Sequence, residues 1–212
     1  MFKTSFKNMI ASLLLMITIF NCTLIIFTSE VNASSAQFYN IAKNVHANFR
    51  KGNFTYDSGV LKQITKSPYK TNNCKITDCS HFVSVALYKY FPSSKRLYMR
   101  QNTRLKEYQL TSKDFYNIGY YKIFLKRRYY GDFSKATIKK LSNYFTSIYV
   151  SKNNLRKGDI LVYTDHVEIF SYMKNGKMYV LNCGSNSAIK AAGDISKSTH
   201  SVKQIKYILR VH

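Results

Sequence analysis

Two residues in this sequence have the types and surroundings that thiol-based catalysis requires. Cys79 directly follows Asp78, a natural helix cap, and an apolar helical pattern continues from it until Phe91-Pro92. A thiol in the first turn of a helix loses its proton readily, because free backbone N–H groups and the positive end of the helix dipole stabilise the thiolate. His166 opens a strand-like segment after a short turn and is the candidate base for that thiol.

A thiol and an imidazole also need a third polar group that fixes the tautomer and the tilt of the ring. Residues 166–172 and 177–181 have the pattern of strands, and Asn175-Gly176 between them is the strongest short-range signal for a hairpin. A two-residue turn there brings Asn182 close to His166 on the adjoining strand. We therefore expect Asn182 to orient the imidazole. Each of the three residues alone is more often structural, so the prediction depends on their combination.

The other elements follow from hydrophobic periodicity. Residues 93–150 are basic and rich in tyrosine, and they show little periodicity apart from one helix. Helices followed by a meander of strands make an α+β layout. The expected elements are helices over 37–49 and around 135–145, an extended loop over 53–77, and strands over 160–163 and 205–211.

The N-terminus has the organisation of an export signal. Two lysines precede an apolar run from about Met9 to Phe27, and the polar stretch after it ends in Val31-Asn32-Ala33, a pattern that signal peptidase recognises. We expect residues 1–33 to be a signal peptide and residues 34–212 to form one domain. The apolar run approaches the length of a membrane span, so a retained anchor is the alternative.

The formal net charge of +23 predicts a polyanionic partner. Residues 1–33 hold two lysines and one glutamate, so the rest of the chain keeps +22. An exported protein meets anionic wall polymers and lipid headgroups before it meets nucleic acid, and the sequence has no zinc-finger spacing or arginine-rich block. We therefore expect a monomer that binds anionic wall polymers and does not bind nucleic acid. Membrane contact is expected only through an uncleaved leader.

Three motifs carry a resemblance to a known family. Residues 78–83, Asp-Cys-Ser-His-Phe-Val, resemble the Asp-Cys-Ser-Gly-Phe-Val motif of the NlpC family of papain-like bacterial cell-wall cysteine peptidases and amidases. Residues 155–163, Leu-Arg-Lys-Gly-Asp-Ile-Leu-Val-Tyr, resemble its Leu-x-x-Gly-Asp-Leu-Val strand, and residues 166–170, His-Val-Glu-Ile-Phe, its His-Val-Gly-Ile-Tyr motif. Asn182 falls where the family has its third polar residue. The resemblance covers about residues 38–211, sparsely between the motifs.

The resemblance implies a papain-like fold, with the cysteine at a helix N-terminus that packs on an antiparallel sheet, and it implies no cofactor. It implies that Cys79 attacks an amide carbonyl, that His166 protonates the leaving amine, and that water then hydrolyses the acyl-enzyme. Asp78 and Ser80 match positions that bind the free amine of a stem peptide, and Tyr56 matches a tyrosine that lines the site. An aspartate cap and a serine in the first turn are also ordinary at any helix start.

The sequence departs from the family pattern at two positions and in one spacing. His81 and Glu168 stand where the family has small residues, which leaves the substrate open. The distance from Cys79 to His166 is longer than a minimal member needs, so we expect an insertion around 93–150.

The expected function is hydrolysis of amide bonds in peptidoglycan stem peptides by a secreted enzyme. Two alternatives remain open. One is a catalytically inactive basic protein that binds the wall or the membrane on the same scaffold, and the other is an exported effector or toxin hydrolase.

Three cysteines remain after the leader, and an odd number indicates a free thiol. We expect Cys79 to be free, and Cys74 and Cys183 either to be two thiols or to be paired with each other. Neighbouring side chains on a strand point to opposite faces, so Cys183 should point away from Cys79 if Asn182 faces His166.

Overall fold

The structure is a computed structural model, in which the chain divides into a unit from Met1 to Ser34 and a unit from Ser35 to His212. Nearly all of the expected signal peptide and all of Cys74 lie outside the described residues. Among the residues that are described, no helix is both long enough and apolar enough to span a membrane. The described residues are 12, 15–16, 34–49, 54–56, 76–92, 100–102, 107–123, 135–148, 150–183 and 195–212.

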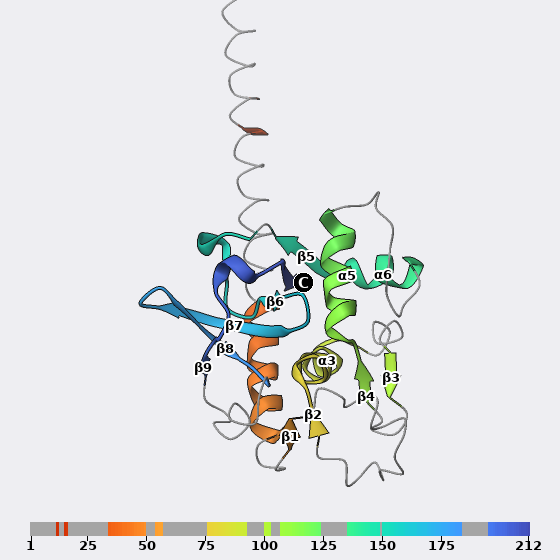
Figure 1. Cartoon of the computed structure of the whole chain (residues 1–212). Coiled ribbons are helices and arrows are strands. Elements are labelled where there is room, and N and C mark those ends of the chain that lie inside the picture. The colour runs from red at the N-terminus through yellow and green to blue at the C-terminus, as the bar shows by residue number, and fades with distance from the viewer. Residues whose placement is uncertain are drawn as a thin grey trace, which may run out of the picture. The chain divides into compact units, whose positions relative to one another are not determined.

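The second unit is an α+β fold, as the order of the patterns predicts, and its centre is a six-stranded antiparallel sheet (Figure 1). The strand order is β5-β10-β6-β7-β8-β9. Two small pairs lie outside this sheet, β1 (Thr55–Tyr56) with β2 (Ile76–Thr77) and β3 (Arg100–Asn102) with β4 (Glu107–Gln109). The strands of the main sheet are β5 (Phe145–Ile148), β6 (Ile160–Val162), β7 (Val167–Lys174), β8 (Lys177–Leu181), β9 (Ser196–Lys197) and β10 (Tyr207–Val211).

The helices match the predicted ones in part. The helix expected over 37–49 extends over 34–49, while the helix expected up to residue 145 ends at Ser142, because Phe145 begins β5 and buries its ring in the core. The helix over 112–123 was not predicted. The labelled helices are α3 (Cys79–Tyr90), α5 (Ser112–Ile123), α6 (Lys135–Ser142) and the 3-10 turns η1 (Lys152–Asn154) and η2 (Val202–Gln204).

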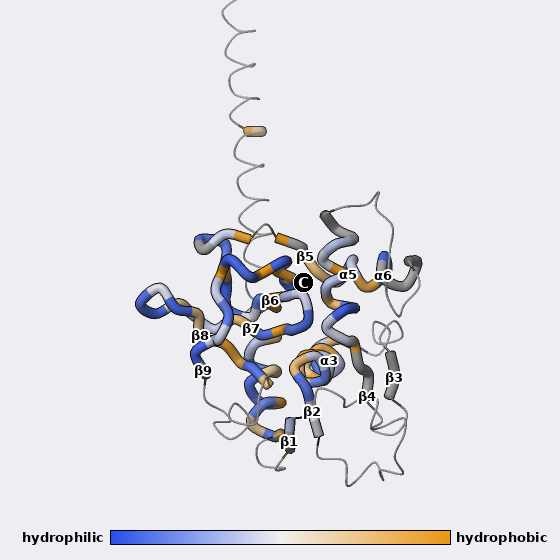
Figure 2. The backbone as a smooth tube through the Cα atoms, in the orientation of Figure 1, coloured by the Kyte–Doolittle hydropathy of each residue, from blue (hydrophilic) through white to orange (hydrophobic). Residues whose placement is uncertain are grey.

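The sheet is apolar on both faces. Alternate residues of β6 and β10 divide between two clusters, with Val162 and Leu209 in the large core and Leu161 and Ile208 in a smaller one. The large core also holds α3, whose residues 79–87 are all buried. Figure 2 shows the contrast with the tip of the β7–β8 hairpin, which is hydrophilic. This burial on both faces explains why β10 is buried along its whole length.

Several described residues of the segment where an insertion was expected, around 93–150, are part of the core. Leu110, Phe115 and Ile118 are buried, and so is Leu141 of α6. The backbone N–H of Leu110 donates to Ser84 Oγ at 2.7 Å, which joins this region to α3. This part of the chain therefore helps to hold the cysteine helix in place.

The β7–β8 hairpin turns at Asn175-Gly176, as predicted, with positive φ angles of 51° and 70°. A regular ladder from this turn would pair Asn182 with Ile169. Instead, the register shifts between Phe170 and Tyr172, so that Ile169 pairs with Leu181. The bulge therefore moves Asn182 one position further along β7, opposite Glu168.

The helix over 34–49 holds this hairpin at two points. Tyr39 Oη lies 2.7 Å from the hydroxyl of Ser171, the extra residue of the bulge. His46 Nε2 lies 3.0 Å from the backbone carbonyl of Asn182, just beyond the end of β8. Positions 39 and 46 are two helical turns apart and therefore share one face. One helix face thus contacts both the bulge and the strand end.

The Gly158-Asp159 motif has a structural role. Gly158 has a φ of +92°, and a Cβ at this position would lie 2.2 Å from the carbonyl oxygen of Ser35, so only glycine fits. The buried carboxylate of Asp159 accepts two hydrogen bonds from Arg210, at 2.7 and 2.8 Å. The aspartate therefore joins the start of β6 to β10 through Arg210, and the glycine allows the helix over 34–49 to approach closely.

Candidate active site

Cys79 occupies the first turn of α3, as predicted. Asp78 caps the helix in an extended conformation, and its Oδ1 accepts hydrogen bonds from the His81 backbone N–H at 2.6 Å and from Ser80 Oγ at 2.7 Å. The Cys79 side chain is free and only 6% exposed. The thiol therefore lies beside unpaired helix N–H groups in a site with little access for water.

His166 lies in the turn before β7, and its side chain lies close enough to that of Cys79 to interact with it. Burial alone would lower the pKa of His166, but its interactions with Cys79 and Glu168 raise it to about 10. The protonated ring is therefore the stable form at neutral pH. The structure brings together the two residues that the sequence selected as nucleophile and base.

Glu168, not Asn182, faces the far side of this ring. Its Oε1 lies 3.4 Å from His166 Nε2, and its side chain is fully buried. Because Nε2 faces the carboxylate, Nδ1 is the nitrogen left to interact with Cys79. Burial would raise the pKa of Glu168, but the nearby His166 and the hydrogen bonds from neighbouring hydroxyls lower it. The ring is thus placed between a thiol and a carboxylate.

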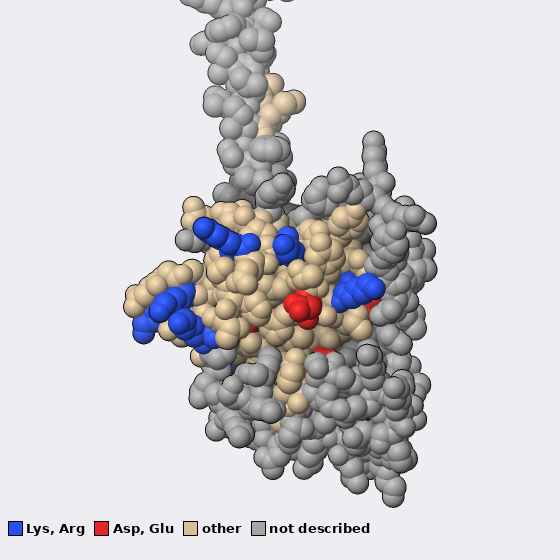
Figure 3. Space-filling model, in the orientation of Figure 1, with Lys and Arg blue, Asp and Glu red and all other residues tan. Residues whose placement is uncertain are grey.

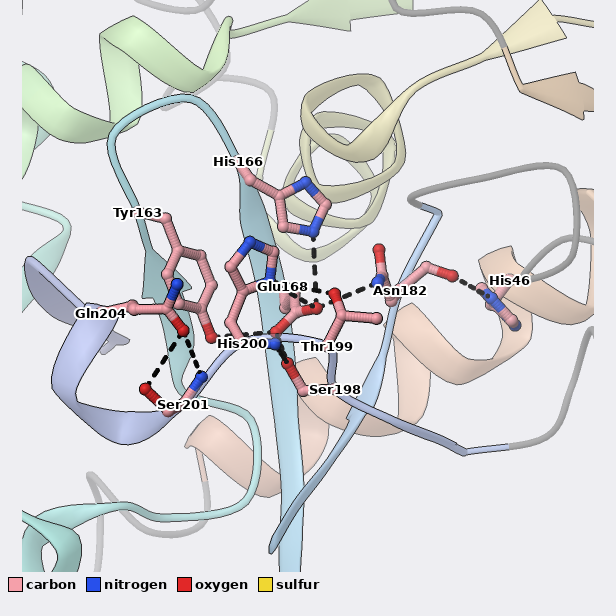
Figure 4. A network of polar contacts seen from close by, with 10 residues as sticks. All are labelled: His46, Tyr163, His166, Glu168, Asn182, Ser198, Thr199, His200, Ser201 and Gln204. Atoms are coloured by element: carbon pink, nitrogen blue, oxygen red, sulfur yellow. Dashed lines mark hydrogen bonds and ion pairs between the residues drawn. The ribbon is translucent and has the colours of Figure 1, made fainter.

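The prediction that Asn182 orients the imidazole directly requires correction. Asn182 Nδ2 donates to Glu168 Oε1 at 2.9 Å, so the amide acts on the carboxylate that in turn faces His166 (Figure 4). The physical reason is the bulge in β7, which places Asn182 opposite Glu168 rather than opposite Ile169. Asn182 therefore acts on the ring only through Glu168, and not by the direct contact that the sequence predicted.

Three further side chains lie around the Glu168 carboxylate, and little in the sequence predicted their positions there. Tyr163 Oη donates to Glu168 Oε2 at 2.9 Å, and Ser198 Oγ donates to the same oxygen at 2.7 Å. His200 Nδ1 lies 3.7 Å from Oε1. Burial and the charge of Glu168 raise the pKa of Tyr163, which keeps it a donor. The one signal in the sequence was the spacing of two residues between His166 and Glu168, which in an extended chain places both side chains on the same side.

The residues proposed to contact substrate have different surroundings. Tyr56 is half-buried on β1 and pairs in register with Thr77, two residues before the cysteine. Asp78 and Ser80 are buried, and the contacts described above make them a helix cap. Tyr56 therefore lies on the strand that pairs with the one leading into the site, while a role of Tyr56, Asp78 and Ser80 in substrate binding stays a prediction.

His81 points into the core, although the family motif has glycine there. Its Nδ1 lies 2.9 Å from Thr77 Oγ1, and its ring stacks on Phe49 with centroids 5.6 Å apart. Its side chain is completely buried. The bulky residue therefore packs behind the helix start and does not occupy the space in front of the thiol.

Cys183 is a free thiol in the same core cluster as Cys79. Burial raises its pKa well above the usual value, and the negative charge of Cys79 contributes. The expectation that Cys183 points away from Cys79 depended on Asn182 facing His166, and Asn182 instead contacts Glu168, so it does not apply. A buried neutral thiol of this kind is unreactive, in contrast to one paired with an imidazole.

A pocket of about 610 Å³ opens between α5 and the turn that precedes His166. Its volume is in the range typical of small-molecule sites. Asp165, the sequence neighbour of His166, lies on one side, and the tyrosines of α5 lie on the other. The described residues that line it are Ser112, Lys113, Tyr116, Asn117, Tyr120, Thr164 and Asp165.

Basic side chains gather over the β7–β8 hairpin on the face that Figure 3 shows. Lys174 and Lys177 flank the turn and are exposed, and Lys197 on β9 is exposed beside them. The proximity of Lys177 and its positive charge lower the pKa of Lys197. These cations are close enough to act together on a polyanion.

No family model matches this chain, and comparisons with curated proteins and with solved structures find none that is similar.

Proposed function

We propose that this chain is a cysteine hydrolase on a papain-like scaffold that cleaves amide bonds in the stem peptides of bacterial peptidoglycan. The observation that carries the proposal is the alignment of Cys79, His166 and Glu168. A helix-start thiol interacts with an imidazole whose Nε2 lies 3.4 Å from a buried carboxylate. This is the order nucleophile, base and orienting group that thiol hydrolases require.

In the proposed reaction, the Cys79 thiolate attacks the amide carbonyl carbon. The tetrahedral oxyanion receives hydrogen bonds from backbone N–H groups at the start of α3, including that of Cys79. The C–N bond then breaks, and the leaving amine takes the proton from His166 Nδ1. Water, deprotonated by the now neutral His166, hydrolyses the thioester and restores the thiol–imidazole pair.

Glu168 has two effects in this scheme. Its negative charge stabilises the imidazolium that forms in each half of the reaction, and its contact with Nε2 keeps Nδ1 directed at the sulfur. Asn182, Tyr163 and Ser198 hold the carboxylate in place with hydrogen bonds of 2.7 to 2.9 Å. These three residues are therefore positioning residues and do not contact the reacting atoms.

The substrate class follows from charge and from the resemblance of the motifs. The exposed lysines of the hairpin and the +22 charge outside the leader favour anionic wall polymers. The pocket that Asp165 lines, next in sequence to His166, has room for part of a stem peptide. The proposed location is outside the cytoplasm, at the cell wall.

Digestion of purified peptidoglycan, with mass spectrometry of the released fragments, tests the proposal. We expect new amine and carboxylate ends at one type of amide bond with the unmodified protein. Alkylation of Cys79 with iodoacetamide should abolish the release without loss of the folded state. The matched control is Cys183→Ala, which removes the other described thiol and should still digest the wall. Equal release before and after alkylation of Cys79 would refute the assignment.

A further inference from the structure

Three side chains around the candidate site form a set of metal ligands that the hydrolase scheme does not require as a set. One ligand atom from each of His166, Glu168 and His200 lies within 4.8 Å of the other two. Glu168 Oε1 is 3.4 Å from His166 Nε2 and 3.7 Å from His200 Nδ1. The three come from β7, the turn before it and the segment after β9, and Figure 4 shows them around one carboxylate oxygen.

The distances suit a zinc ion. Zinc binds imidazole nitrogen and carboxylate oxygen at about 2.0 to 2.2 Å, so that neighbouring ligand atoms of a tetrahedral site lie about 3.3 to 3.5 Å apart. The separation of 3.4 Å already lies in this range, and that of 3.7 Å reaches it with a shift of a few tenths of an ångström, while the two imidazole nitrogens lie within 4.8 Å of each other. Two histidines and one glutamate are also a ligand set that zinc accepts, with the fourth position open to water.

One atom of the set has an unsatisfied bonding requirement. His166 Nε2 is buried and has no aligned hydrogen-bond partner in the described part of the chain, even though the carboxylate is 3.4 Å away. A buried polar atom without a partner is costly. A cation placed between the ring nitrogen and Glu168 would satisfy both groups.

The outer shell of such a site is already in place. Glu168 Oε2 accepts from Tyr163 and Ser198, and Oε1 accepts from Asn182, which fixes the carboxylate. Hydrogen bonds of this kind orient metal ligands and raise metal affinity. The ring of His200 stacks on that of Tyr163 with centroids 4.3 Å apart, which restricts its rotation.

We propose that His166, Glu168 and His200 bind one Zn²⁺ ion reversibly and that the bound ion inhibits the hydrolase. The inhibition rests on the proposed function, whereas the binding does not. Zinc on Nε2 takes the place of the proton there and leaves Nδ1 as an N–H group. A zinc-bound neutral ring can give up its Nδ1 proton only by becoming an imidazolate, so it is a much weaker acid than the imidazolium and does not readily protonate the leaving amine.

Zinc binding is tested by isothermal titration calorimetry on the leaderless chain, after treatment with EDTA and a reducing agent that does not bind metal. We expect one Zn²⁺ per chain, and an affinity more than about tenfold weaker in His200→Ala, since loss of a ligand should cost at least as much as loss of an outer-shell contact. His212→Ala, an exposed histidine outside the cluster, is the matched control and should bind as the unmodified chain does. His200→Asn serves in its place if His200→Ala does not fold.

The variant Cys79→Ser separates this site from thiol coordination and should keep its zinc affinity. Equal affinity in His200→Ala and the unmodified chain would overturn the proposal, and so would loss of binding in Cys79→Ser. Inhibition is measured as the zinc concentration that halves peptidoglycan release, relative to the zinc-free rate of each variant. That concentration should rise more than about tenfold in His200→Ala. Zinc binding without any hydrolase activity would refute the proposed function alone.

Discussion

The carboxylate of Glu168 lies 3.4 Å from His166 Nε2, on the side of the ring that faces away from Cys79. A neutral amide in this position would hold the ring but would not stabilise its charge. The carboxylate does both, because it lies in a site from which water is nearly excluded. Replacement of Glu168 by a neutral residue of the same shape therefore tests the effect of the charge apart from the effect of the geometry.

Glu168→Gln keeps the shape of the side chain and removes the charge. We expect peptidoglycan hydrolysis to fall by roughly a hundredfold, because the imidazolium loses its counter-charge. Asn182→Ala should retain more activity than Glu168→Gln, since the amide acts only through the carboxylate. Initial rates of fragment release from both variants decide the order. If Asn182→Ala were the more damaging change, direct orientation of the ring by Asn182 would be supported instead.

Cys79→Ala should abolish hydrolysis and change the free energy of unfolding by no more than about 1 kcal/mol, because the change opens no large cavity. In the native chain, iodoacetamide should modify Cys79 much faster than Cys183, whose raised pKa keeps it a thiol. Peptide mapping after a short exposure measures both sites at once. Preferential labelling of Cys183 would contradict the assignment of the nucleophile.

The raised pKa of His166 gives stability a defined pH dependence. The folded ring holds its proton up to about pH 10, whereas the unfolded ring releases it near its ordinary pKa of 6.5. The folded state binds more protons between these values, so the contribution to stability is complete below pH 6.5 and is lost as the pH rises through 10. Urea unfolding in EDTA at several pH values should therefore show a decline across this window.

The decline should be smaller in His166→Gln, which has no titrating ring, and unchanged in His212→Gln. A curve for His166→Gln that is parallel to that of the unmodified chain would mean that another group causes the decline.

Gly158→Ala tests the close approach at the start of β6. The new Cβ would lie 2.2 Å from the Ser35 carbonyl oxygen at a φ of +92°, so we expect a loss of more than about 2 kcal/mol in the free energy of unfolding. Gly176→Ala is the matched control. It also has a positive φ, +70°, but nothing lies within 4 Å of its Cβ, and a loss of only about 1 to 2 kcal/mol is expected. Urea denaturation of both variants gives the comparison.

Wall binding should depend steeply on salt, because exposed charges are screened over roughly 8 Å at physiological ionic strength. Cleavage of a small soluble stem peptide should change little over the same range, since the thiol and the carboxylate are buried and the ring is only 12% exposed. Sedimentation with insoluble walls measures the first quantity, and a soluble-substrate assay measures the second. Binding that is constant from low to high salt would indicate a specific receptor in the wall.

The sequence was sufficient for the parts of the site that depend on local rules. Asp78 caps a helix, Cys79 follows it, and Asn175-Gly176 makes a tight turn, and each of these requires only a few neighbouring residues. The role of Glu168 could not be predicted in the same way. It depends on a bulge several residues away and on hydroxyls from other segments, which no local pattern specifies.

The helix over 112–123 was missed for a different reason. It contains Gly119, which weakens helices, and its tyrosines blur the division between an apolar and a polar face. The structure explains the glycine, because a Cβ there would lie 2.4 Å from the ring of Tyr207. Packing against β10 therefore overrides a poor local propensity, and the sequence alone does not reveal this contact.

The contacts between the helix over 34–49 and the β7–β8 hairpin help to set the strand register on which the site depends. Without the hydrogen bond between Tyr39 and Ser171, the bulge in β7 is free to be lost, and β8 then shifts by one residue relative to β7. Such a slide would present Cys183 to Glu168 in place of Asn182, and would replace an amide donor with a thiol. Removal of residues from the helix over 34–49 would then abolish the proposed activity without changing Cys79, His166 or Glu168.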